Sequence, residues 1–134
     1  MNEPTGAAAC LNGWLIIDKP PGYSSAQIVG RIKRLTGGLK VGHGGTLDPL
    51  ATGVLPIAIG EATKTAAYAM LGSKGYHFTL KWGEARDTDD SEGEIVQASH
   101  IRPSRQEIYK VLPEFTGQIS QIPPKYSALK VNGQ

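Results

Sequence analysis

The chain has few of the residues that mark secreted and membrane-spanning proteins. Its 134 residues include one cysteine, Cys10, which excludes an intrachain disulfide framework and favours a reducing compartment. No run of about 18 apolar residues occurs, and the residues before Cys10 lack the basic and apolar segments of a signal peptide. We therefore expect a cytoplasmic protein with no membrane span.

Motifs for metal or nucleoside triphosphate binding are incomplete. The histidines at positions 43, 77 and 100 do not have the spacing of a zinc site. The acidic segment DTDDSEG, residues 87–93, differs from a calcium loop because its glycine comes one place late and no glutamate follows at the twelfth position. GGLKVGH, residues 37–43, ends without the Lys-Ser or Lys-Thr pair of a P-loop. We expect no metal site.

Acidic residues are also scarce between Lys19 and Gly60, where Asp48 is the only carboxylate. Asp-Pro pairs commonly initiate turns, so a turn-forming role has to be considered first. Here, however, Pro49 restricts the Asp48 backbone to extended conformations, and glycines on both sides let the backbone approach a ligand closely. The loop within VGHGGTLDPLATGVLP, residues 41–56, is therefore predicted to present one carboxylate. The cations of this stretch are Lys19, Arg31, Lys33, Arg34 and Lys40. We expect those from Arg31 to Lys40 to contact phosphates.

Hydrophobic patterning and capping signals predict alternating strands and helices. Ser24 with Gln27 and Ser104 with Glu107 form capping boxes, each followed by apolar residues at helical spacing. An Asn132-Gly133 hairpin signal has no return strand, so we expect the front part of a longer protein. The expected strands are 14–18, 54–60, 76–83 and 94–99, the expected helices are 24–36, 61–71 and 104–115, and residues 1–12 form a flexible leader.

Several separated motifs carry a family resemblance. GHGGTLDPLATGVLPIAIGEATK, preceded by DKPPGYSS and followed by YSALKVNG, closely resembles the TruB branch of tRNA pseudouridine synthases, the bacterial relatives of dyskerin. The resemblance runs from about Gly13 to the end of the chain. It implies the α+β pseudouridine synthase catalytic fold, a mixed, mainly antiparallel sheet flanked by helices and truncated on its C-terminal side. Residues 13–134 then correspond to the N-terminal part of the catalytic domain.

The resemblance implies isomerisation of uridine to pseudouridine in the T arm of tRNA, at tRNA position 55, without a cofactor. Asp48 matches the family's essential catalytic aspartate. Whether this carboxylate attacks the ribose or the base stays open. The implied partner is tRNA, bound by a monomer. Two rival interpretations also stay open: a non-catalytic tRNA-binding or tRNA-folding module, and a structural or assembly role.

The remaining site residues follow from the resemblance one at a time. His43 matches the histidine that fills the space left by the extruded uridine, and Tyr76 matches a tyrosine that stacks on the target base. Lys19 and Pro20 match a motif packed beneath the active loop, whereas Lys64 and Lys130 match positions near the RNA or the loop.

Two departures from the family pattern accompany this match. Gly44 stands where threonine is common, which we expect to alter loop flexibility more than chemistry, and Arg86 stands where threonine is usual. Full-length members also continue into an RNA-gripping thumb, an arginine that pairs with the catalytic aspartate, and a small C-terminal RNA-binding domain. We therefore expect the chain alone to be incomplete as an enzyme.

Overall fold

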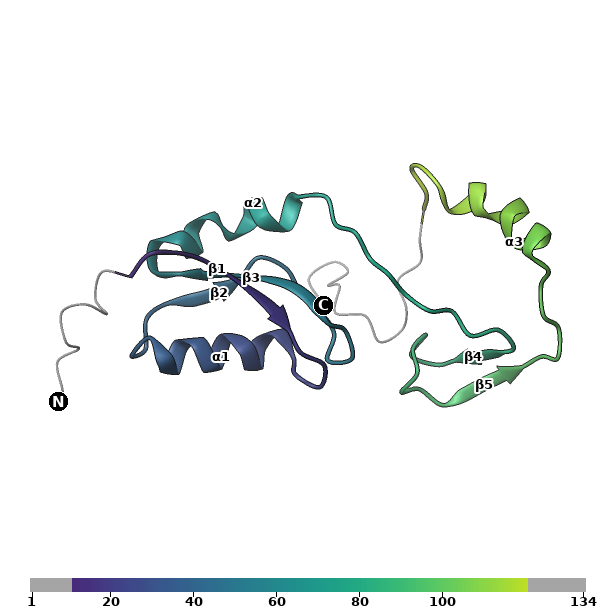
Figure 1. Cartoon of the computed structure of the whole chain (residues 1–134), viewed down its shortest axis with the longest axis horizontal. Coiled ribbons are helices and arrows are strands. Elements are labelled where there is room, and N and C mark those ends of the chain that lie inside the picture. Colours follow the sequence, from purple (N-terminus) through teal and green to yellow (C-terminus); the bar gives the residue numbers. More distant parts are fainter. Residues whose placement is uncertain (1–10, 121–134) are drawn as a thin grey trace. The chain divides into compact units, whose positions relative to one another are not determined.

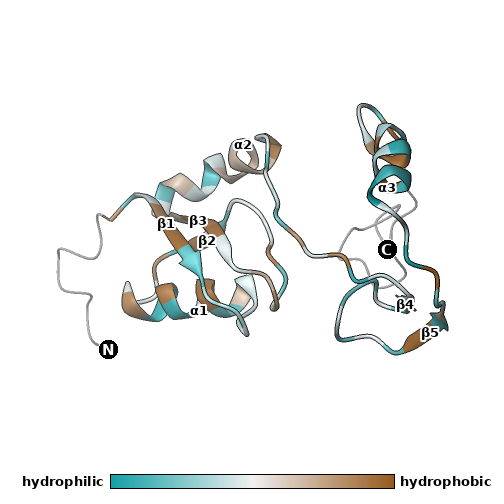
Figure 2. Cartoon of the chain, turned by 45° about the vertical axis from the view of Figure 1, so that its right-hand side comes forward, coloured by the Kyte–Doolittle hydropathy of each residue, from teal (hydrophilic) through white to brown (hydrophobic). Residues whose placement is uncertain are grey.

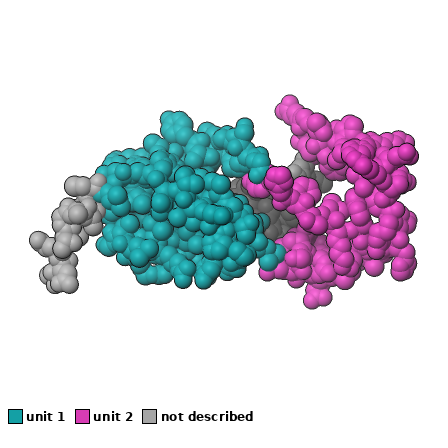
Figure 3. All heavy atoms as spheres, viewed as in Figure 1, with its two compact units in different colours: residues 1–75 teal, residues 76–134 magenta. Residues whose placement is uncertain are grey.

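The computed structural model describes residues 11–120. They belong to two compact units, one ending at Gly75 and the other beginning at Tyr76 (Figure 3). Most of the leader expected over residues 1–12 and the hairpin expected at residues 132–133 lie outside the described residues. Within the described residues, no helix combines the length and hydropathy needed to cross a membrane.

The first unit is built on a three-stranded antiparallel sheet (Figure 1). Its strands are β1 (Gly13–Lys19), β2 (Val41–His43) and β3 (Gly53–Ile59), and β3 lies between the other two. The strands expected over 14–18 and 54–60 are confirmed, whereas β2 falls in a segment for which no strand was expected. With the antiparallel pair in the second unit, this sheet confirms the α+β class.

Pro56 occupies the central strand, where proline is normally excluded because it cannot donate a ladder hydrogen bond. The Pro56 carbonyl accepts a hydrogen bond from the Gly44 N–H at 2.8 Å, just beyond the last residue of β2. Because the N–H and C=O of one strand residue point to the same side, the donor that proline lacks would have pointed past the end of β2. Pro56 therefore lacks only the reciprocal bond to the Gly44 carbonyl, which lies just outside the β2 ladder.

Helix α1 (Ser25–Leu35) packs on one face of this sheet (Figure 1). The expected capping box is present: Ser24 Oγ accepts from the Gln27 N–H at 3.2 Å, and Gln27 Oε1 accepts from the Ser24 N–H at 2.8 Å. Hydrophobic and hydrophilic residues alternate along the helix (Figure 2). Its apolar side meets β3, and the buried residues of this core are Ile28, Leu55, Ile57 and Ile59.

The helix expected over 61–71 is present but begins with a tighter turn. Residues Gly60–Thr65 form a 3₁₀ helix, η2, and α2 follows over Ala66–Leu71. The Thr63 and Thr65 hydroxyls each donate at 2.7 Å to the carbonyl three residues earlier. These short-range bonds favour a turn closed every three residues over the α-helical spacing. The two segments lie on the face of the sheet opposite α1 (Figure 1).

The second unit contains a two-stranded antiparallel sheet and a helix. Its elements are β4 (Glu84–Arg86), β5 (Ile95–Ala98), α3 (Arg105–Val111) and a 3₁₀ turn, η3 (Leu112–Phe115). The strand expected over 94–99 is confirmed. The helix expected over 104–115 is also confirmed, since α3 begins with the Ser104–Glu107 capping box and η3 extends it to Phe115.

The strand expected over residues 76–83 is wrong. In the structure these residues carry no sheet pairing, and β4 begins only at Glu84, after Gly83 with a φ of 96°. Phe78 within the segment is 82% exposed. The alternation of apolar and polar residues specifies two faces of a strand but not a neighbouring strand. Among the described residues, the only backbone hydrogen bond from this segment to another is at Gly83, whose carbonyl accepts from the Ser99 N–H at 2.9 Å.

Candidate functional site

The loop between β2 and β3 carries Asp48 at the surface of the first unit. The Ala51 N–H donates to the Asp48 carbonyl at 3.0 Å, which closes a turn over Pro49 and Leu50. Two buried side chains from other parts of the unit, Ser25 and Lys19, bind the backbone on either side of Asp48. The backbone of this carboxylate is therefore fixed from below while its side chain faces outward.

Ser25 fixes the residue before Asp48. Its hydroxyl donates to the Leu47 carbonyl at 3.0 Å and accepts from the Leu47 N–H at 2.9 Å. Ser25 is only 2% exposed, so both backbone polar groups of Leu47 are satisfied away from water. The first turn of α1 is thereby joined to the loop.

Lys19 fixes the residue after Asp48. The side chain is fully buried, and its ammonium group donates to three backbone carbonyls: Pro20 at 3.1 Å, Tyr23 at 2.7 Å and Pro49 at 3.3 Å. An ammonium has three donors, so this set uses all of them. The Pro49 carbonyl also accepts from the Gly22 N–H at 2.8 Å, where Gly22 has a φ of 81° that favours glycine. Lys19 therefore contacts the loop backbone at Pro49, with the Pro20 carbonyl as another of its acceptors, and forms no ion pair with a carboxylate among residues 11–120.

The Asp48 carboxylate makes no hydrogen bond or ion pair with any residue between 11 and 120. A turn-forming aspartate normally accepts a backbone N–H nearby, and the second unit provides two examples. Asp87 Oδ1 accepts from the Glu94 N–H at 2.9 Å, and Asp90 Oδ1 accepts from the Glu92 N–H at 2.9 Å. Asp48 does not perform this role, because backbone groups alone close its turn.

His43 is the last residue of β2, opposite Ile57 of β3. Its Nδ1 atom is buried and has no hydrogen-bond partner among the described residues. Leaving a buried polar nitrogen unpaired costs about 1–3 kcal/mol, so most such atoms in proteins have partners. His43 therefore retains an unused hydrogen-bonding group one residue before the loop begins.

Gly44, at the start of the loop, is buried against the opposite helix and β1. A Cβ atom placed on Gly44 would lie 2.6 Å from the Ala69 Cβ and 3.2 Å from the Trp14 ring. Neither contact leaves room for the threonine that is common here in the resembling family unless α2 moves. Glycine at position 44, where the family commonly has threonine, therefore lets α2 pack closely against the start of the loop, in addition to any effect on loop flexibility.

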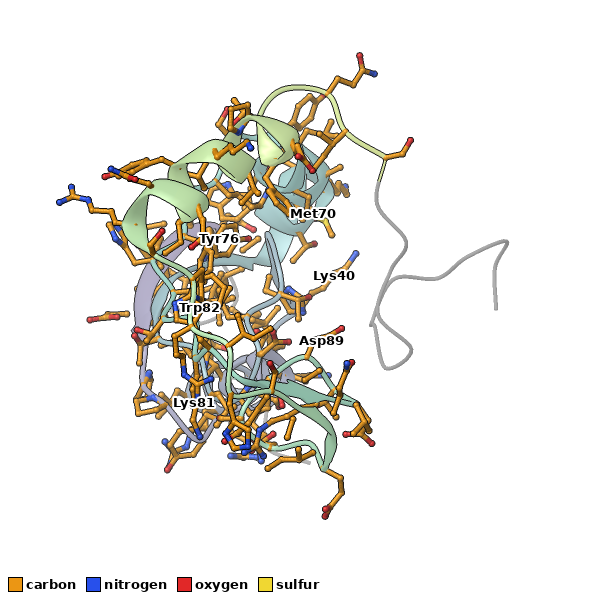
Figure 4. The ribbon with its side chains drawn as sticks, turned by 90° about the vertical axis from the view of Figure 1, so that its right-hand side faces the viewer. Lys40, Met70, Tyr76, Lys81, Trp82 and Asp89 are labelled. Carbon is orange, nitrogen blue, oxygen red and sulfur yellow. The ribbon has the colours of Figure 1, made fainter. Side chains whose placement is uncertain are left out.

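The other expected site residues belong to other segments of the chain. Lys64, in η2, is exposed and forms an ion pair with Glu61, and this hydrogen bond lowers the pKa of the Glu61 carboxyl. Tyr76 is 66% exposed and belongs to the second unit (Figure 4). Lys130 lies outside the described residues. Among residues 11–120, no group of three or more His, Cys, Asp or Glu side chains is placed to hold a metal ion.

Sequence reasoning missed two contributors to these two units. Ser25 is not among the expected site residues, because Ser24 accounts for the helix cap. A second serine on the core-facing side of an amphipathic helix is the signal that marks it. Arg86, noted only as a departure, organises the acidic turn: its guanidinium donates to the Gly93 carbonyl at 2.7 Å and to Glu84 Oε2 at 2.9 Å. No local sequence pattern predicts that Arg86 would organise this turn.

Known proteins resemble this chain over most of its length. It is 58% identical over 124 residues to tRNA pseudouridine synthase B of Rhodospirillum rubrum and 57% identical over 124 residues to that of Gluconacetobacter diazotrophicus. Each match covers 92% of this chain and 40% of the relative, so the chain spans about two fifths of the length of these relatives. One chain of a crystal structure of a Cbf5-Nop10-Gar1 complex is 30% identical, with a TM-score of 0.60 over 96% of this chain and 33% of that one.

A family model also matches most of the chain, over residues 33–134. That model describes the N-terminal domain of the TruB family of pseudouridylate synthases. The matched region includes β2, the Asp48 loop and β3, whose arrangement is described above. This chain belongs to the TruB family of pseudouridylate synthases.

Proposed function

We propose that residues 13–134 form the N-terminal part of the catalytic domain of a tRNA pseudouridine synthase, with Asp48 as its catalytic residue. The substrate is a uridine in the T arm of tRNA, at tRNA position 55. The observation that carries this proposal is the unpartnered Asp48 carboxylate on a loop whose flanking residues, Leu47 and Pro49, are hydrogen-bonded to buried side chains. Such an anchored but chemically free carboxylate suits a group that must meet a flipped nucleotide.

The reaction is an isomerisation, so its atoms balance within the substrate. The bond between N1 of uracil and C1′ of ribose breaks, and a bond between C5 and C1′ forms. N1 gains a proton, and the hydrogen on C5 leaves to solvent. No electrons are gained or lost and no group is donated, which is why the proposed reaction requires neither a cofactor nor a metal. A carboxylate can serve it as a nucleophile or as a proton acceptor.

His43 and Tyr76 complete the proposed uridine site. His43 supports this role through its position at the end of β2, one residue before the Asp48 loop, and through an Nδ1 atom that has no partner among residues 11–120. Tyr76 offers a ring that is largely open to solvent and to a stacking base. Lys64 and Lys130 are proposed to lie near the RNA, and the whole protein is proposed to act on tRNA as a monomer in the cytoplasm.

Tritium release tests the proposal, because only isomerisation exchanges the hydrogen on C5. The assay uses tRNA containing uridine tritiated at C5 and a chimera in which this chain replaces the matching region of the Rhodospirillum rubrum relative. We expect the chimera to release tritium. The Asp48→Asn chimera should fold and bind tRNA but release none, since an amide can neither attack nor accept the proton.

Asp89→Asn is the matched control. Asp89 is an exposed aspartate with a φ of 59°, a conformation that asparagine also adopts readily. This variant should release tritium at the unsubstituted rate. Tritium release by a purified Asp48→Asn chimera would contradict the proposal, and tRNA binding without release by the unsubstituted chimera would favour a non-catalytic tRNA-binding module.

A further inference from the structure

The outer side of α1 carries an open groove of about 500 Å³. It lies on the side of the helix away from the core residue Ile28, at positions spaced three and four residues apart. Gly30 forms its hollow, because a Cβ placed there would meet nothing within 4 Å. The lining residues are Tyr23, Ala26, Gln27, Gly30, Arg31 and Arg34.

Positive charge in this groove is uncompensated within the described part of the chain. Helix α1 contains no acidic residue, and Asp18 and Asp48 are the only carboxylates between residues 11 and 60. Arg31 and Arg34 form no ion pair with any residue from 11 to 120. They lie three residues apart on one helix face, where like charges destabilise the helix. The groove is therefore arranged for an external anion.

Tyr23 orients one of these cations. The Arg31 guanidinium lies over the Tyr23 ring, 4.9 Å from its centroid, which restricts a side chain that is otherwise free in solvent. A stacked guanidinium still offers its planar N–H groups at the edges, and these suit the paired oxygens of a phosphate.

The groove is also joined to the Asp48 loop. The Tyr23 carbonyl accepts from the Lys19 ammonium at 2.7 Å, and the same ammonium donates to the Pro49 carbonyl at 3.3 Å. The Gly22 N–H adds a third connection, to the Pro49 carbonyl at 2.8 Å. An anion held by Arg31 and Arg34 would thus lie on a helix fixed directly to the loop that presents the carboxylate.

We propose that this groove, formed by the outer side of α1 and by Tyr23 just before it, binds the phosphodiester backbone of the RNA substrate. Arg31 and Arg34 donate charge-assisted hydrogen bonds to non-bridging phosphate oxygens. This inference rests on the proposed function, because the rigid connection to the Asp48 loop favours an RNA whose uridine reaches that loop. An acidic peptide carries the same charge, but its binding would not explain why the groove is hydrogen-bonded to the Asp48 loop.

The test is the salt dependence of tRNA binding by the chain. The groove variant is Arg31→Ala/Arg34→Ala, and the matched control is Arg105→Ala/Lys110→Ala, which removes the same charge from exposed positions of α3 outside the groove. The dissociation constant is measured at several KCl concentrations, with circular dichroism to verify folding. We expect the groove variant to flatten the log–log slope by about 1.4 to 1.8, the value for two lost phosphate contacts. The control should retain the original slope.

Four results would overturn the inference. They are an unchanged slope in the groove variant, equal flattening in both variants, no tRNA binding by the unsubstituted chain at low salt, and equally strong, groove-dependent binding of poly-glutamate. The last would indicate an acidic protein partner. Tritium release by the chimera is scored separately, so an active, Asp48-dependent chimera with an unchanged salt slope rejects the groove and retains the proposed function.

Discussion

Ser25 and Leu47, which are 22 residues apart, exchange two hydrogen bonds through one hydroxyl group. The hydroxyl occupies both backbone polar groups of Leu47, the residue before Asp48. A single buried side chain thereby determines where the loop backbone lies relative to α1. Because the contact touches only the loop backbone, Ser25 is a positioning residue for Asp48.

Removal of this hydroxyl should impair turnover more than binding. Ser25→Ala leaves the Leu47 N–H and C=O without their partner, which should lower the free energy of unfolding by about 1–3 kcal/mol. In the chimera, we expect slower single-turnover tritium release with little change in tRNA affinity. Ser24→Ala is the control, because loss of its helix cap costs about 1 kcal/mol without touching the loop. Equal turnover rates in the two variants would remove Ser25 from the positioning role.

The contact between Gly44 and Ala69 predicts a rescue. Gly44→Ala should destabilise the chain by about 1–3 kcal/mol, because the new methyl would lie 2.6 Å from the Ala69 Cβ. Adding Ala69→Gly should recover part of this loss, although glycine in α2 itself costs about 1 kcal/mol. Urea unfolding of the two single variants and the double variant measures the coupling.

Gly42→Ala is the control for this cycle. Gly42 lies in β2, and a Cβ placed there meets only the Thr63 Cγ2 at 3.9 Å, an ordinary contact. We expect it to be milder than Gly44→Ala and insensitive to Ala69→Gly. Strict additivity of Gly44→Ala and Ala69→Gly would mean that the two positions do not press on each other.

His43 should affect the extrusion of the base more than the binding of tRNA. Taking a uridine from its stack costs a few kcal/mol, and a side chain that fills the gap lowers this cost. We expect His43→Ala in the chimera to reduce the single-turnover rate while the dissociation constant for tRNA changes little. His77→Ala, at an exposed histidine of the second unit, provides the comparison. A wild-type rate for His43→Ala would show the assignment to be wrong.

The two capping boxes should respond differently to acid. The Ser104 hydroxyl and N–H bind the Glu107 carboxylate and hold the pKa of Glu107 below its ordinary value of 4.5. A depressed folded pKa means that this stabilisation is present above pH 4.5 and is lost as the pH falls through the lower folded value. The corresponding Gln27 at α1 does not titrate.

Amide hydrogen exchange between pH 6 and pH 3 distinguishes the two helices. After correction for intrinsic exchange, α3 should lose protection below pH 4.5 while α1 retains it. Glu107→Gln should make α3 insensitive over this range, since glutamine keeps the capping geometry seen at Ser24. Equal loss of protection in both helices, or an unaltered response in Glu107→Gln, would contradict the role given to this carboxyl.

Short-range signals were read correctly from the sequence because their causes are local. The capping boxes at Ser24 and Ser104 begin helices where expected, and apolar runs of strand length give β1 and β3. The Asp48 loop was also identified from its glycines, its proline and the absence of other carboxylates. The family followed from separated motifs in order, which the family model and the relatives confirm.

Contacts between distant segments were decided only by the tertiary structure. Strand β2 exists because β3 offers it a partner strand. Residues 76–83 have an equally suitable pattern, but among the described residues they have only the single backbone hydrogen bond at Gly83. The three carbonyls around Lys19 and the hydroxyl beneath Leu47 meet only when β1, α1 and the loop converge. The sequence by itself determined which carboxylate is presented. The fold decided what holds it in place, because hydrogen-bond satisfaction of buried groups depends on which backbone atoms packing brings within reach.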